Sequence, residues 1–245
     1  MESIYYLRKS FLSFLLIFFC TETILIAQDI PKNYVLTEFK QASLKIPFNE
    51  RFQFENFRKG FVYKQTGKRS EAKLNYSYLY GDILFIGPSL DTLSISDLHL
   101  VKNVAIGESI YFYDQKYGFV EIIGERDGVK IGRKSQLALV DYDKRASFER
   151  FGSPTSKQNQ TTFVGMPTHV SIDNITNLTL RSQVLYFIID KNNRFHLAGR
   201  DGFIKVYARA KKKVVAYLNG HDIDYNNEND LKKVIEDCAS LSDLP

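Results

Sequence analysis

The chain of 245 residues contains no tryptophan, only two methionines and only two cysteines, but it has 19 phenylalanines and 15 tyrosines. This aromatic-rich composition favours a β-rich fold with an aromatic core. If an N-terminal export signal that contains Cys20 is removed, Cys238 remains alone, and no internal disulfide framework can hold the fold. Cys238 occupies an apolar position of a helical pattern, so we expect a buried and unreactive thiol.

Common catalytic and binding motifs are missing as well. The four histidines lack the spacing of a zinc site, and no serine stands in a Gly-x-Ser-x-Gly elbow. Neither a Walker-type phosphate loop nor a dinucleotide fingerprint occurs. The segment 222–233 resembles a calcium loop, but Asn227 replaces the required glycine and Lys233 the required glutamate. We expect no catalytic residue, no metal and no cofactor. Whether the chain is an enzyme stays open, and the sequence favours a protein without catalytic activity.

The longest apolar run lies near the N-terminus and is too short to span a membrane. Phe11–Phe19 is almost wholly apolar, two basic residues precede it, and Ala27 offers a small residue at a cleavage point. Glu22 interrupts the run well before the ~20 residues that a membrane span needs. We predict a cleaved signal peptide at 1–27 and export to the periplasm or the outside of the cell. The residue before Cys20 is bulky, which argues against a lipoprotein.

The stretch from Phe57 to Tyr142 predicts an antiparallel β-meander. Short runs of β-branched and aromatic residues, such as Ile110–Tyr113 and Phe119–Ile123, alternate with polar turn signals. Asp127-Gly128 suits the type I′ turn of a hairpin, which needs positive φ at both positions. The predicted fold class is mainly β (α+β): an antiparallel β-meander forming a curled sheet or partly open barrel, with a C-terminal helical appendage.

The mature chain is expected to have two parts. Residues 28–198 form the β-rich domain, with a flexible polar loop at about 150–165, and 199–245 form a helical segment packed on the sheet. Apolar residues of the second part recur at spacings of three and four, which is typical of amphipathic helices. They are Phe203, Tyr207, Ala210, Val214, Leu218, Leu231, Val234, Ile235 and Cys238. Between Pro31 and Pro47 the pattern fits a short helix and an irregular arm equally well.

Three short motifs of the meander follow one another in a recognisable order. They are Gly60-Phe61-Val62, Leu74-Asn75-Tyr76 and Asp82-Ile83-Leu84. This series resembles the opening of uncharacterised exported β-rich proteins found widely in Bacteroidota, in which a Gly-x-Val strand precedes a Leu-Asn-Tyr strand and an Asp-x-Leu strand. The resemblance implies a cell-envelope location and carries no activity with it.

Five tyrosines are the candidate binding residues: Tyr76, Tyr78, Tyr80, Tyr111 and Tyr113. The two-residue spacing of the first three places them on one face of a strand. Aromatic stripes on an exposed sheet stack on sugars or anchor a protein partner. The alternative is that these rings cover the core with their hydroxyls at its rim.

Charge is unevenly distributed over the C-terminal segment. Residues 199–213 contain six basic residues and one acidic residue, whereas 221–245 contain two basic and seven acidic residues. The two stretches could attract each other, or the basic stretch could make a peripheral contact with anionic lipid headgroups. A net charge of +5 without a localised footprint does not argue for nucleic acid.

Three function hypotheses remain open from the sequence. The first is a non-enzymatic exported cell-envelope protein, a binding module for a protein, a glycan or an envelope surface, without a transmembrane span in the mature chain. The second is a carrier of a small apolar ligand in a barrel-like sheet. The third is a hydrolase with a dispersed Asp/His site. Asp141 and Asp143 lie two residues apart, as paired carboxylates that act on sugars could, but the flanking Lys144 and Arg145 favour surface ion pairing.

Overall fold

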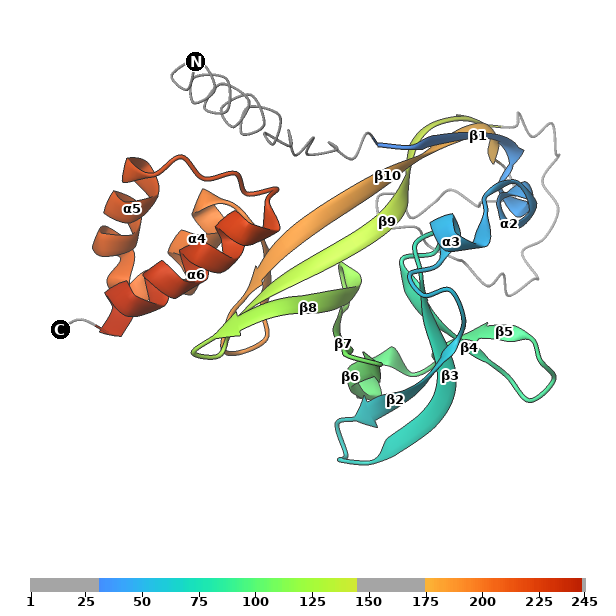
Figure 1. Cartoon of the computed structure of the whole chain (residues 1–245), viewed down its shortest axis with the longest axis horizontal. Helices are drawn as coiled ribbons and strands as arrows, with labels where there is room; N and C mark the ends of the chain where they lie inside the picture. Colours follow the sequence, from blue (N-terminus) through green and yellow to red (C-terminus); the bar gives the residue numbers. More distant parts are fainter. Residues whose placement is uncertain (1–30, 145–174, 244–245) are drawn as a thin grey trace, which may run out of the picture. The chain divides into compact units, whose positions relative to one another are not determined.

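The computed structural model describes residues 31–144 and 175–243, and the structural statements below concern these residues. The predicted signal peptide (1–27) and the predicted loop at about 150–165 lie outside them. The described chain is mainly β, as predicted, with an antiparallel meander sheet and helices at its C-terminal end (Figure 1). None of the described helices is long and apolar enough to cross a membrane.

Within the described residues, eleven strands belong to the sheet. They are β1 (Asn33–Glu38), β2 (Arg58–Lys64), β3 (Arg69–Ser77), β4 (Asp82–Ile86), β5 (Thr92–Ser94), β6 (Val101–Ile106), β7 (Ser109–Asp114), β8 (Gly118–Arg126), β9 (Val129–Lys144), β10 (Ile175–Ile189) and β11 (Phe195–Leu197). Their order is β1-β10-β9-β8-β7-β6-β2-β3-β4-β5, and β11 pairs with β10. Most neighbours in the sheet are therefore also neighbours in the chain.

Turn chemistry sets the register of the hairpins. Arg126 pairs with Val129, so Asp127 and Gly128 form a two-residue loop. Their φ values are 50° and 79°, the left-handed region that a type I′ turn requires. The predicted hairpin of β7 and β8 is also confirmed, with Gly118 at a φ of 72° beside the paired Asp114.

The sheet is neither closed nor strongly curled, so the predicted curled sheet or partly open barrel is wrong in this respect. Its path ends on β1 and β5, and no ladder among the described strands joins these two ends. Closure of a barrel needs two long edge strands in a matching stagger. The strand β5 has only three residues, all of them exposed, and β1 turns at Glu38 into short helical turns.

The helices gather in two places along the chain. The short α2 (Ala42–Lys45) and α3 (Phe48–Arg51) follow β1, and α4 (Arg200–Val206), α5 (Lys211–Gly220) and α6 (Glu228–Asp243) follow β11. Every residue of the predicted helical stripe except Ala210 is buried, which confirms the amphipathic pattern. The pattern is interrupted at Tyr207, where the backbone leaves the helical region at a ψ of 39°.

The largest core cluster joins these C-terminal helices to the sheet. Phe203 of α4, Val214 of α5 and Leu231 of α6 pack against Ile131 of β9 and Ile188 of β10. A second cluster fills the interior of the meander between β2, β3, β4, β6, β7 and β8. The helical segment is therefore an integral layer on the long strands, and it presents its polar sides to solvent.

Candidate functional site

Three of the five candidate tyrosines make ring contacts with one another, and the other two make ring contacts with phenylalanines. Tyr76 of β3 and Tyr111 of β7 stack with ring centroids 5.4 Å apart and an interplanar angle of 9°. Tyr78 meets Tyr76 edge-on at 5.9 Å. Tyr80 packs edge-on against Phe39, and Tyr113 packs in the same manner against Phe119. Because β3 ends at Ser77, Tyr78 and Tyr80 lie in the following turn and not on a strand face.

Burial decides what the tyrosine group can do. Tyr76 is 2% exposed and Tyr111 is 1% exposed, so neither ring offers a face to a sugar or a protein partner. Within the described chain, neither hydroxyl has a hydrogen-bond partner. An unpaired buried hydroxyl costs about 1–3 kcal/mol, and native proteins contain few of them. Burial raises the pKa of both phenols, so both stay protonated at neutral pH.

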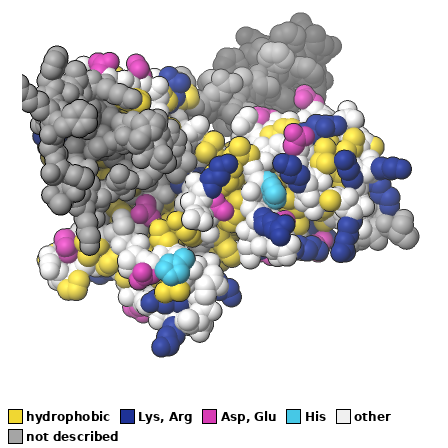
Figure 2. Space-filling model, turned by 180° about the vertical axis from the view of Figure 1, so that it is seen from behind, with side chains coloured by type: hydrophobic (Ala, Val, Ile, Leu, Met, Phe, Trp, Pro, Cys, Tyr) yellow, Lys and Arg dark blue, Asp and Glu magenta, His cyan; other side chains and the backbone are white. Residues whose placement is uncertain are grey.

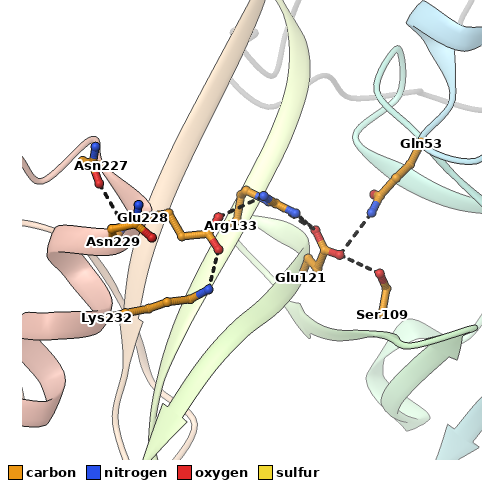
Figure 3. Close-up of polar contacts among 8 residues, drawn as sticks. All are labelled: Gln53, Ser109, Glu121, Arg133, Asn227, Glu228, Asn229 and Lys232. Atoms are coloured by element: carbon orange, nitrogen blue, oxygen red, sulfur yellow. Dashed lines mark hydrogen bonds and ion pairs between the residues drawn. The ribbon is translucent and has the colours of Figure 1, made fainter. Parts of the chain in front are cut away.

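Glu121 pairs with Tyr111 across the β7–β8 ladder, and the hydrogen-bonding capacity of its carboxylate is fully used (Figure 3). One oxygen of Glu121 accepts hydrogen bonds from the Ser109 hydroxyl at 2.6 Å and from the Gln53 amide at 3.1 Å. The other oxygen accepts two from the Arg133 guanidinium, at 2.8 Å and 3.3 Å. Four donors hold this carboxylate in one orientation, so it has no free lone pair with which to act as a general base.

Arg133 extends this network to the C-terminal helices. Its second terminal nitrogen donates to Glu228 of α6 at 3.0 Å, and Lys232 donates to the other oxygen of Glu228 at 2.6 Å. Asn227 accepts hydrogen bonds from the backbone of Asn229 and Asp230, so it caps the helix (Figure 3). The network thus ties α6 to three neighbouring strands of the sheet.

Sequence reasoning missed the Glu121–Arg133 network because its members are distant in the chain. The hairpin registers contain the signal, since Tyr111 pairs with Glu121, and Glu121 pairs with Arg133, in adjacent strands. Directly paired residues share a face of the sheet. Reading the two hairpins together would therefore have aligned these three side chains.

A lysine is buried on the opposite face of β9. Lys134 is 1% exposed, and its ammonium group donates to the carbonyls of Gly81 at 3.0 Å and Tyr117 at 2.7 Å. Burial lowers the pKa of this amine to about 8. A Cβ atom on Gly81 or Gly118 would approach its nitrogen to 3.0 or 3.1 Å, so two glycine turns make room for the charge. Through these two hydrogen bonds, Lys134 connects the turns at Gly81 and Tyr117 to the long strand β9.

The exposed sides of α4, of α5 and of the 3-10 turn between them (Ala208–Ala210) form a basic face. We use this name for Arg200, Lys205, Arg209, Lys211 and Lys212, all of which are exposed. Arg200 donates to Asn219, whereas the other four make no ion pair or hydrogen bond within the described chain. Figure 2 shows Lys and Arg side chains spread over the part of the surface that the C-terminal helices form.

Among the described side chains of α6, no acidic group pairs with these four cations. Glu228 pairs with Arg133 and Lys232, and Glu236 pairs with Arg126 at 3.5 Å. Asp237 accepts a hydrogen bond from the Tyr217 hydroxyl. The expected attraction between the two oppositely charged stretches therefore does not extend to the basic face, which remains available for a partner.

The other sequence candidates for chemistry are found apart from one another. Cys238 is fully buried, as predicted, and burial raises the pKa of its thiol to about 12. Asp141 and Asp143 are exposed, and Asp143 accepts a hydrogen bond from Asn177. His169 lies outside the described residues. Within 31–144 and 175–243, no group of three or more His, Cys, Asp or Glu residues is arranged to hold a metal ion.

Comparison with models of known protein families gives no match, and comparisons with curated proteins and with solved structures give none either.

Proposed function

We propose that the protein is a non-enzymatic, exported cell-envelope protein that works as a binding module, and that its basic face holds an anionic envelope surface. The observation that carries this proposal is the set of four exposed cations, Lys205, Arg209, Lys211 and Lys212, that no described carboxylate pairs. Only Asp201 adds an exposed negative charge within the same stretch of chain.

The interaction would be electrostatic. Each lysine or arginine near an anionic surface contributes about 1 kcal/mol. The apolar sides of α4 and α5, represented by Phe203 and Val214, are buried in the core and cannot insert into a bilayer. Without insertion, binding depends on charge alone, so it must weaken as salt shortens the range of the interaction.

A binding role is supported by how the reactive side chains are used. The Glu121 carboxylate is held by four hydrogen bonds, and the Lys134 ammonium group is buried against two carbonyls. The Cys238 thiol is buried with a raised pKa, which keeps it protonated and unreactive. The alternative, a carrier of a small apolar ligand, requires a barrel-like sheet, but the described strands leave the sheet open.

Co-sedimentation with vesicles tests the proposal. The mature chain is mixed with phosphatidylcholine vesicles that contain or lack phosphatidylglycerol, and with soluble polyphosphate. We expect sedimentation with the anionic vesicles and none with the neutral ones. Binding of polyphosphate in preference to anionic vesicles would identify a soluble polyanion as the partner. No binding to any of these anions would contradict the proposal.

Two charge-reversal variants locate the binding surface. The variant K205E/R209E/K212E changes the basic face, and K68E/K73E/K102E makes the same change in net charge on exposed residues of the β2, β3 and β6 region. We expect the first to abolish vesicle binding and the second to retain most of it. Equal losses would show that only the net charge matters, which would remove the basic face from the proposal.

Export is a separate part of the proposal and has its own test. The intact mass of the protein purified from its own organism is measured by native mass spectrometry. A chain that begins at Gln28 is expected from cleavage after Ala27. A mass that includes residues 1–27 would contradict cleavage of the signal.

A further inference from the structure

The interior of the meander contains two phenol groups that the protein itself leaves without partners. Tyr76 and Tyr111 lie on different strands, stack almost in parallel and are both more than nine-tenths buried. Neither hydroxyl meets a donor or acceptor of the described chain within hydrogen-bond geometry. The surrounding cluster is otherwise apolar, with Leu74, Ile83 and Val104 among its members.

The nearest polar groups form hydrogen bonds with one another. Tyr111 lies directly opposite Glu121 across the β7–β8 ladder, and the charge of Glu121 acts on both phenols. The Ser109 hydroxyl donates its proton to Glu121 at 2.6 Å, and it lies near enough to the Tyr111 phenol to lower its pKa without meeting hydrogen-bond geometry. The Glu121 carboxylate beside the two hydroxyls is therefore fully used, whereas the Ser109 oxygen can still accept a hydrogen bond.

The chemistry of these surroundings restricts what can bind between them. A charged molecule would lose its hydration in this apolar cluster, and the neighbouring Glu121 and Arg133 already neutralise each other. Two hydroxyl donors require an acceptor, and the oxygen-rich neighbourhood favours a molecule that also donates. A small neutral molecule with both capacities meets these conditions, and water is the smallest of them.

We propose that the Tyr76 and Tyr111 hydroxyls form a binding site for an internal water molecule, which accepts a hydrogen bond from each phenol. This site is independent of the basic face. It gives the tyrosine group a role inside the fold, as the polar centre of a core that is otherwise apolar.

Conservative substitutions distinguish a bound water from two hydroxyls that make no hydrogen bond. In Tyr76→Phe or Tyr111→Phe, the water loses one of its partners, so we expect each variant to lower Tm by about 2–4 °C. The double variant removes both partners and the water together, so its loss should be smaller than the sum. Tyr113→Phe is the matched control, because its half-buried ring packs edge-on against Phe119, and no change in Tm is expected.

A crystal structure of the mature chain supplies the direct observation. The expected result is a single ordered water within about 3 Å of both hydroxyl oxygens. If the Tm of each single Phe variant is unchanged or raised, and no water is ordered at this position, the hydroxyls have no hydrogen-bond partner and the proposal is wrong. Density for an organic molecule, or an added mass in native mass spectrometry, would replace the water with a ligand and overturn the proposal.

Discussion

Lys134 shows how one buried charge affects the whole fold. Its folded-state pKa of about 8 lies below the ordinary lysine value of 10.5. Between these values the unfolded chain binds a proton that the folded chain has released, so this group makes the protein more stable as pH rises. A difference of this size corresponds to about 3 kcal/mol across the window.

The test compares urea unfolding of the natural chain and of Lys134→Met between pH 7.5 and 10. Cys238, whose folded-state pKa is raised to about 12, lowers the stability of both proteins above about pH 9. The readout is therefore the stability of the natural chain minus that of the variant. We expect this difference to rise from about pH 8 upward. A difference that stays constant with pH would show that Lys134 titrates normally.

Arg133 is the residue on which the polar network depends. Arg133→Met leaves the carboxylates of Glu121 and Glu228 without their shared cation, and we expect a loss of about 2–3 kcal/mol in the free energy of unfolding. Arg126→Met is the control, because Arg126 is half exposed and its pair with Glu236 at 3.5 Å belongs to the surface. Exposed pairs contribute less than about 1 kcal/mol. Similar losses in the two variants would contradict a special role for Arg133.

The close approach of α4 to the sheet depends on a glycine. A Cβ atom on Gly202 would lie 2.4 Å from the carbonyl oxygen of Leu197 and 3.1 Å from Ile188. Gly202→Ala must therefore push α4 away from β10 and β11, and we expect a loss of about 1–3 kcal/mol. Gly220→Ala, at the end of α5, meets nothing within 4 Å and should be neutral or stabilising by up to about 1 kcal/mol. The stability of both variants is measured by thermal unfolding. An equal change in stability in the two variants would contradict the packing argument.

Local sequence patterns predicted the hairpins and the C-terminal helices. They did not predict the pairing of strands that are distant in the chain. The Asp127-Gly128 turn and the buried stripe of α4 to α6 depend on residues close in sequence. Val35, Leu36, Phe39 and Ala42 have helical spacing, yet Asn33–Glu38 form a strand because they pair with β10. The strand β9 is a single strand of 16 residues, because β10 pairs with it along nearly its whole length.

For the candidate site, charge was easier to predict than burial. The basic stretch is visible in the sequence, and the helices leave it exposed. The tyrosine stripe has the alternation of an exposed strand face, but residues 74–77 are buried on both faces of β3. Alternation cannot reveal that a second layer covers the other face. Asn75, for example, can be fully buried because its side-chain oxygen accepts from the Phe54 backbone N–H and its amide nitrogen donates to the Phe54 carbonyl.

The whole molecule combines an antiparallel sheet, a helical layer that shares its core, and a cationic surface on that layer. The salt dependence of vesicle binding tests this account most directly. The fraction of protein bound to phosphatidylglycerol vesicles is measured from about 0.01 M to 0.15 M salt, over which the Debye length falls from about 30 Å to 8 Å. The account predicts strong binding at low salt that is largely lost at the upper end. Binding that is absent at low salt, or that does not respond to salt, would contradict a function based on the basic face.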